Sequence, residues 1–252
     1  MFIEMPSSFP KDKFQQFGLL SAEVFPAPWS DEDLNDPLQR RQHSDRSYMA
    51  VCYRYRTCTE CNEEFKALLA NAPDSWREWN HHPELAYKLE RCLYTFFMNG
   101  LSVFESLGFC LYFIGGAIRP SDFPDMGKPR RINLQSTSRA FTAAFPQTSI
   151  TKGLAELPQK AEFSTIDEIR NILAHRLSGK RSLRSYGTYP NGPYTREDVW
   201  YITDAIELVF DEGLIQRLLD GITNLLTALI AASLEFAENN KPAKAVPGAP
   251  TS

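Results

Sequence analysis

The chain has 252 residues, of which 43% are hydrophobic and 12% aromatic, and its formal net charge at pH 7 is −4. This composition can bury a sizeable core, so it excludes a disordered chain. The negative net charge excludes a general polyanion binder, and any contact with nucleic acid would have to use local basic patches.

Residues 1–43 are rich in Pro, Asp and Gln, and they predict an irregular N-terminal extension. A helical bundle is expected over residues 44–238. Its first helix begins near Ser44, a suitable N-cap, carries apolar residues at three- and four-residue steps, and ends before Pro73. Residues 239–252 hold few large apolar side chains and predict a disordered tail.

A second helix opens at Pro83, which is favourable in a first helical turn, and continues to the glycines at 115–116. It is apolar over a wide arc, so we expect it to be the central helix of the bundle. Three prolines and a glycine in residues 119–131 prevent it from continuing. Short helices are expected over residues 138–145 and 150–157.

Another helix begins at Ser164, with Asp167 as a near capping box, and ends around Gly179. Thr195 is the expected N-cap of the last long helix. The apolar face of that helix would hold Val199, Ile202, Ile206, Val209, Phe210, Leu214, Leu218, Ile222, Leu225 and Leu229. No strand-like alternation of useful length is visible. The predicted fold class is therefore all-α, a four-helix bundle with additional short helices.

The helix from Ser164 carries the run Arg-Asn-Ile-Leu-Ala-His at 170–175. At about 100° per residue, the core stripe of this helix contains Ile166, Ile169, Leu173 and Leu177. Asn171 and His175 fall together on the opposite face, and Arg170 falls at the edge of the stripe. A cation beside an imidazole suits phosphodiester chemistry, whereas the alternative is that Asn171 and His175 simply face solvent.

Two further observations bear on this choice. Ile172 also lies on the outward side, which favours contact of this face with another helix or a second subunit. The same Arg-to-His spacing recurs at Arg77 and His82, at a junction between a loop and a helix, and we interpret that match as accidental.

Together with its surroundings, the run resembles a known family. The segment 141–176 reads Phe-x-x-x-Phe-Pro, then a short Leu-containing helix, then Phe163, Ile166 and Ile169-Arg170-Asn171-x-Leu173-Ala174-His175-Arg176. It resembles the HEPN superfamily (higher eukaryotes and prokaryotes nucleotide-binding), whose mark is an Arg followed by four to six residues and a His, with a polar residue directly after the Arg. The close resemblance covers about a seventh of the chain.

The resemblance implies a HEPN-type bundle that works as a homodimer through the motif helix. Two facing motifs would form one composite site of a metal-independent endoribonuclease that needs no cofactor and leaves a 2′,3′-cyclic phosphate. Arg170, Asn171 and His175 would be the catalytic residues. The RNA-binding residues would be Arg176, Lys180, Arg181, Arg184 and Tyr186.

The same resemblance leaves other functions open. Some HEPN proteins bind RNA or nucleotides without cleavage, and others serve as structural dimers or adaptors. A neutralising partner or a nucleotidyltransferase partner, and a toxin or defence role, are also associated with the family.

Other residue clusters have simpler interpretations. Cys58-x-x-Cys61 lacks the second pair that structural zinc normally needs, so these thiols are expected in the core. Tyr186 with Tyr189 and Tyr194 could stack on unpaired bases or could cover the end of the bundle. The N-terminus has no signal-peptide pattern, and the apolar stretch 101–118 is interrupted by polar residues. We therefore expect a cytoplasmic protein with no membrane contact.

Overall fold

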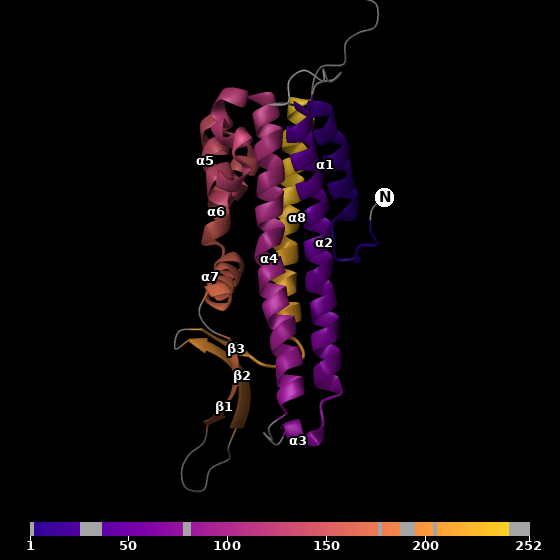
Figure 1. Ribbon diagram of the computed structural model, residues 1–252, viewed down its shortest axis with the longest axis vertical. Coiled ribbons are helices and arrows are strands. Elements are labelled where there is room, and N and C mark those ends of the chain that lie inside the picture. Colours follow the sequence, from indigo (N-terminus) through magenta and orange to yellow (C-terminus); the bar gives the residue numbers. More distant parts are fainter. Residues whose placement is uncertain are drawn as a thin grey trace, which may run out of the picture. The chain divides into compact units, whose positions relative to one another are not determined.

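The computed structural model describes residues 3–25, 37–77, 82–175, 178–186, 195–203 and 206–241. The prediction of a mostly helical protein is confirmed (Figure 1). Its elements are α1 (Lys11–Val24), α2 (Pro37–Ala70), α3 (Asp74–Arg77), α4 (Pro83–Ile118), the 3-10 turns η1 (Pro120–Asp122), η2 (Pro124–Gly127) and η3 (Pro129–Arg131), α5 (Leu134–Ala144), α6 (Ser149–Glu156), η4 (Leu157–Gln159), α7 (Ala161–His175), β1 (Lys180–Tyr186), β2 (Thr195–Thr203), β3 (Ile206–Val209) and α8 (Leu214–Asn240).

The chain forms two compact units. The first unit contains Met1–Phe9, Ala50–Phe104 and Leu157–Leu226, and the second contains Pro10–Met49, Glu105–Glu156 and Thr227–Ser252. The helices α2, α4 and α8 each contribute residues to both units. The motif helix α7 belongs to the first unit.

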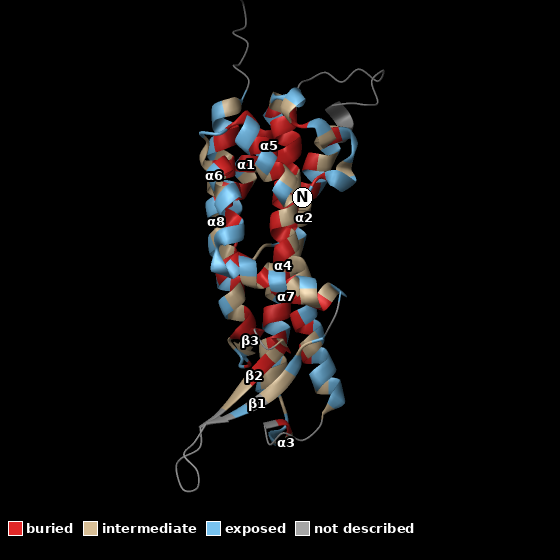
Figure 2. Ribbon diagram, turned by 90° about the vertical axis from the view of Figure 1, so that its left-hand side faces the viewer, coloured by how far each residue is buried: buried red, intermediate tan, exposed pale blue. Residues whose placement is uncertain are grey.

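In the first unit, α7 packs its apolar stripe against α4 (Figure 2). The ring of Phe163 on α7 meets Phe104 on α4 edge to face, with 5.4 Å between centroids. The stripe predicted from the helical period is confirmed where it is described, since Ile166, Ile169 and Leu173 are all buried. Leu177 lies outside the described residues.

The largest departure from the predicted fold is an antiparallel sheet with strand order β1-β2-β3. The prediction of a helix from Thr195 is wrong, because Thr195–Thr203 forms β2, Ile206–Val209 forms β3, and α8 begins only at Leu214. The run Val-Trp-Tyr-Ile-Thr in β2 is rich in β-branched and aromatic residues, which favour strands. Its apolar residues also matched a helical spacing, and pairing with β1 decided between the two.

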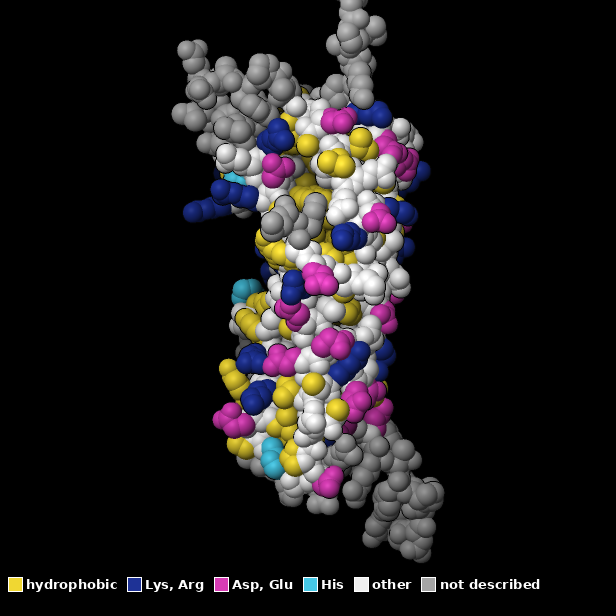
Figure 3. Space-filling model, turned by 90° about the vertical axis from the view of Figure 1, so that its right-hand side faces the viewer, with side chains coloured by type: hydrophobic (Ala, Val, Ile, Leu, Met, Phe, Trp, Pro, Cys, Tyr) yellow, Lys and Arg dark blue, Asp and Glu magenta, His cyan; other side chains and the backbone are white. Residues whose placement is uncertain are grey.

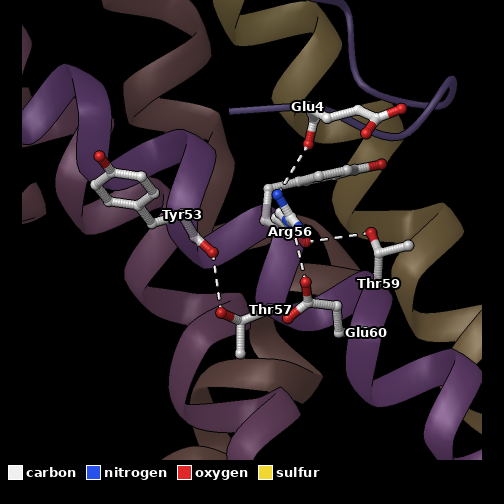
Figure 4. Close-up of polar contacts among 7 residues, drawn as sticks. Glu4, Tyr53, Arg56, Thr57, Thr59 and Glu60 are labelled. Carbon is white, nitrogen blue, oxygen red and sulfur yellow. Dashed lines mark hydrogen bonds and ion pairs between the residues drawn. The ribbon is translucent and has the colours of Figure 1, made fainter. Parts of the chain in front are cut away.

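The predicted irregular N-terminal extension is also corrected. Residues 3–9 lie on α2 in the first unit, where the Tyr55 hydroxyl donates a hydrogen bond to Ser8 Oγ at 2.9 Å and the Tyr55 ring packs on Phe9. Arg56 joins the same segment to α2, because it donates to the Glu4 carbonyl at 3.5 Å and to Glu60 Oε1 at 2.7 Å (Figure 4).

In the second unit, α1 is a helix although the sequence did not predict one. The ring of Phe14 stacks on Tyr48 of α2 with 4.1 Å between centroids, and the Tyr48 hydroxyl donates to the Phe14 carbonyl at 2.9 Å. The helix α2 begins at Pro37, so Ser44 is not its N-cap. Ser44 is instead buried, with its Oγ 3.4 Å from Cys110 Sγ.

The other predicted boundaries lie closer to the structure. The helix α4 begins at Pro83 as predicted and runs to Ile118, past the glycines at 115–116. Gly115 does not end the helix; it lets the Phe123 ring lie directly against the backbone, where a Cβ would clash. The C-terminal helix α8 ends at Asn240, and the rest of the predicted tail from residue 242 lies outside the described residues.

Among the residues that the structure describes, two helices, α4 and α8, are long and apolar enough to cross a membrane by length and composition alone. The most apolar 18-residue window of α4 is 72% buried inside the protein, and that of α8 is 39% buried. The burial of α4 is what a core helix of a folded domain requires.

Candidate functional site

The three motif residues lie on the solvent side and the edge of α7. Asn171 and His175 are exposed, as the helical projection predicted, and Arg170 is half-buried. Arg170 Nη1 donates to Asn171 Oδ1 at 2.9 Å, and Asn171 Nδ2 donates to Asp167 Oδ1 at 3.1 Å. Ile172 is half-buried. The structure therefore links the cation to the amide directly, while His175 stands one turn further along the helix.

His175 faces an open hollow of about 530 Å³ between α7 and α4. Two tyrosines of α4 line this hollow, and both are exposed, at 63% for Tyr87 and 45% for Tyr94. The other residues lining it are Glu90, Arg91, Leu173 and Ser178. The hollow thus combines an imidazole, a guanidinium and two aromatic rings.

Glu90 of α4 binds two groups that follow α7 in the chain. Its Oε1 accepts a hydrogen bond from the Gly179 backbone N–H at 2.7 Å, and its Oε2 accepts one from Trp200 Nε1 at 2.9 Å. Trp200 is fully buried and stacks on Phe97, with 5.5 Å between centroids. Gly179 lies against the indole, where a Cβ would overlap the ring. These contacts hold the end of α7, and with it His175, beside the tyrosines of α4.

Sequence reasoning missed Tyr87, Arg91 and Tyr94. They stand four and three residues apart on α4, so they share one narrow stripe of the helix. Two tyrosines that flank an arginine on the polar side of a helix could have been recognised in the sequence as a candidate binding surface. Their proximity to His175 was not readable, because it depends on how α7 packs on α4.

The structure separates the basic residues that were predicted to bind RNA. Lys180 is exposed on β1, whereas the guanidinium of Arg184 on the same strand forms an ion pair with Glu207 of β3. Arg176 lies outside the described residues, and so does the side chain of Tyr186.

Arg181 departs most clearly from its predicted role. Only 13% of its side chain is exposed, and its guanidinium pairs with Asp198 of β2. It also donates to the Trp76 carbonyl at 3.0 Å and lies over the Trp76 ring, 4.2 Å from the centroid. Arg181 is therefore corrected from an RNA-binding residue to a structural one, because its donors are directed to groups of the protein.

Replacing Arg181 by Ala is expected to destabilise the first unit by about 1–3 kcal/mol, because Asp198 loses its partner in a mostly buried place. The measurement is chemical denaturation of the variant and the wild type. Lys180→Ala is the control, because this side chain is exposed on the same strand. An Arg181→Ala variant of unchanged stability would contradict the structural role.

The cysteine pair Cys58-x-x-Cys61 belongs to the core, as predicted. All five cysteines are free and buried: Cys52, Cys58, Cys61, Cys92 and Cys110. Burial raises the pKa of the Cys52 and Cys61 thiols to about 11 and that of the Cys92 and Cys110 thiols to about 12. It also raises the pKa of Cys58. Thiols of this kind are poor nucleophiles near neutral pH.

We expect the thiol reagent DTNB to label none of these cysteines in the native protein at pH 8 and all five in denaturant. The free energy of unfolding should also fall as the pH rises from about 9 towards 11. In that window thiols of the unfolded chain lose protons while the buried ones keep them, so the unfolded state binds fewer protons and gains stability. Rapid labelling of the native protein would contradict this expectation.

The second Arg-to-His match does not form a comparable site. The side chain of Arg77 lies outside the described residues. His82 Nε2 lies 2.7 Å from Ser75 Oγ, and its ring meets Trp76 edge to face. This arrangement fits the packing of a helix start.

The distribution of surface charge does not mark a further binding site. On the face drawn in Figure 3, Lys and Arg side chains of the described residues are interspersed with Asp and Glu and form no continuous basic area. Within the described ranges, no group of three or more His, Cys, Asp and Glu side chains is placed to hold a metal ion.

No protein-family model, curated protein or solved structure matches this chain. The interpretation of the site therefore depends on its own residues and their chemistry.

Proposed function

We propose that the protein is a HEPN-type, metal-independent endoribonuclease of the cytoplasm that acts on RNA as a homodimer. One observation carries the proposal: the exposed imidazole of His175 faces a hollow lined by two exposed tyrosines and an arginine. The hydrogen bond between Arg170 and Asn171 on the same helix supports it further.

The chemistry requires only groups of this kind and the RNA itself. The ribose 2′-oxygen attacks the neighbouring phosphorus, the bond from phosphorus to the 5′-oxygen breaks, and the products are a 2′,3′-cyclic phosphate and a 5′-hydroxyl. An imidazole can accept the 2′-hydroxyl proton or donate a proton to the leaving 5′-oxygen. A guanidinium such as that of Arg170 can stabilise the charge that grows on the phosphate, with Asn171 orienting it.

A second copy would complete the site. One His175 cannot both accept and donate at the same moment, whereas two motif helices facing each other would supply two imidazoles. Ile172 lies on α7 between Asn171 and His175 and is half-buried within one chain. Ile172→Asp is therefore the variant that should dissociate the dimer, and sedimentation velocity measures this directly.

The test is incubation of structured and unstructured RNA with the purified protein in excess EDTA. Cleavage with cyclic-phosphate ends supports the proposal. Loss of cleavage in the EDTA samples only, with activity in added Mg²⁺, would show that the reaction is metal-dependent and would overturn this mechanism.

A second candidate function is RNA or nucleotide binding without cleavage. The exposed tyrosines of the hollow favour it, because stacking of bases on aromatic rings requires no proton transfer. RNA binding without any cleavage would favour this function over the first. The third alternative, a structural dimer or adaptor, would show a dimer broken by Ile172→Asp and no RNA binding.

A further inference from the structure

The stripe Tyr87, Arg91 and Tyr94 on α4 has the composition of a base-stacking platform. Both tyrosines are exposed, at 63% and 45%, on the polar side of the N-terminal part of α4. Exposing two large aromatic rings on one side of a helix loses the stabilisation that their burial would contribute. The cost suggests an occupant that covers them.

We propose that this hollow binds single-stranded RNA by stacking two of its unpaired bases on Tyr87 and Tyr94. The inference rests on the proposed action on RNA and names the part of the site that selects the substrate. Every base has a π face that can stack on a tyrosine, so the recognition is for unpaired bases and not for one sequence.

The spacing of the rings sets the length of the strand. Tyr87 and Tyr94 are seven residues apart, which is about 10 Å along a helix axis. Stacked bases of one strand rise by about 3.4 Å each. The two rings therefore match bases about three steps apart, and the stripe accommodates roughly four nucleotides.

The charges of the hollow are compatible with this occupant. Arg91 forms an ion pair with Glu64, and both side chains are nearly half exposed, at 47% and 45%. Exposed ion pairs of this kind are weak, so a phosphate of the RNA can replace the Glu64 carboxylate. Both oxygens of Glu90 accept hydrogen bonds from the protein. His175 and Ser178 add further hydrogen-bonding groups at the rim.

A protein occupant fits less well. The only aliphatic side chain that lines the described hollow is Leu173, which is itself 8% exposed. A stable protein interface buries about 800 Å² on each partner around an apolar centre, whereas a hollow of about 530 Å³ is in the size range of small-ligand sites.

The experiment measures the binding of a fluorescein-labelled hexanucleotide by anisotropy. The RNA carries 2′-O-methyl groups throughout, so it has no 2′-hydroxyl for cleavage and the measurement is independent of catalysis. Tyr87→Ala and Tyr94→Ala should each weaken binding roughly 5- to 140-fold, which is the usual effect of removing one stacking side chain. Tyr87→Phe and Tyr94→Phe should retain binding within about threefold, because the ring remains.

Tyr53→Ala is the matched control. Tyr53 is 51% exposed on α2 and does not line the hollow; its carbonyl accepts a hydrogen bond from Thr57 within the helix (Figure 4). This variant should bind like the wild type. A duplex of the same sequence should bind more weakly than the single strand, because its bases are already stacked.

The possible results separate this inference from the proposed function. Wild-type binding that is unchanged in both Tyr→Ala variants overturns the stacking platform and leaves RNA binding intact. Tyrosine-dependent binding without cleavage of ordinary RNA supports the platform while the ribonuclease proposal fails. No binding by the wild type overturns the platform, while the ribonuclease proposal is decided by the cleavage assay in EDTA. Loss of the dimer in Tyr87→Ala, measured by sedimentation, would identify the hollow as a subunit contact and overturn the platform.

Discussion

Substitution of His175 by Ala is expected to reduce RNA cleavage roughly 10²- to 10⁴-fold, the usual contribution of a general acid or base. The imidazole is exposed at the last turn of α7, so its removal should change the free energy of unfolding by no more than about 0.5 kcal/mol. The measurement is single-turnover cleavage of labelled RNA with enzyme in excess, accompanied by thermal unfolding and sedimentation of the variant.

His82→Ala is the matched control for this prediction. It removes the histidine of the accidental motif match, which lies beside Ser75 and Trp76 and not in the hollow. Cleavage that survives in His175→Ala but is lost in His82→Ala would locate the chemistry elsewhere and contradict the assignment of His175. Equal loss in both variants, with intact folding, would also remove the special role of His175.

Substitution of Trp200 by Ala is expected to destabilise the first unit by about 3–5 kcal/mol, as large-to-small substitutions of buried aromatic residues do. The variant loses the stacking on Phe97, the hydrogen bond to Glu90 and the contact with Gly179. Urea denaturation measures the loss. The same change should lower RNA cleavage at temperatures where the variant is folded, because the end of α7 is no longer held beside α4.

Trp200→Phe separates packing from hydrogen bonding. It keeps an aromatic ring on Phe97 but removes the Nε1 donor, so Glu90 loses one of its two hydrogen bonds. We expect a smaller loss of about 1–3 kcal/mol. If Trp200→Ala cost less than about 1 kcal/mol, the indole would not be the link between the sheet and α4 that its burial indicates.

The helices could be predicted from the sequence to the extent that their signals are local. The stripe of Ile166, Ile169 and Leu173 and the start of α4 at Pro83 follow from a 3.6-residue period and from the chemistry of a first turn. The helix α1 was missed because its pattern is short and stands among prolines. Its stability depends on the stacking of Phe14 on Tyr48, which a local pattern does not contain.

The strands were missed for a related reason. The apolar residues of β2 occur at spacings that a helix could also use, and strand formation depends on hydrogen bonds to β1, whose partner residues are up to 21 positions away. Where a local pattern fits both a helix and a strand, the chain adopts the structure whose hydrogen-bonding partners are present in the folded protein.

For the candidate site, the sequence by itself determined which residues could do chemistry and which side of α7 they occupy, because the helical period assigns faces without reference to the rest of the chain. Only the tertiary structure decided what surrounds them. It brought Tyr87 and Tyr94 beside His175, and it placed Arg181 against Asp198 and Trp76 and away from the hollow. These contacts join residues that are far apart along the chain, and the packing that brings them together follows from burial of many apolar side chains at once.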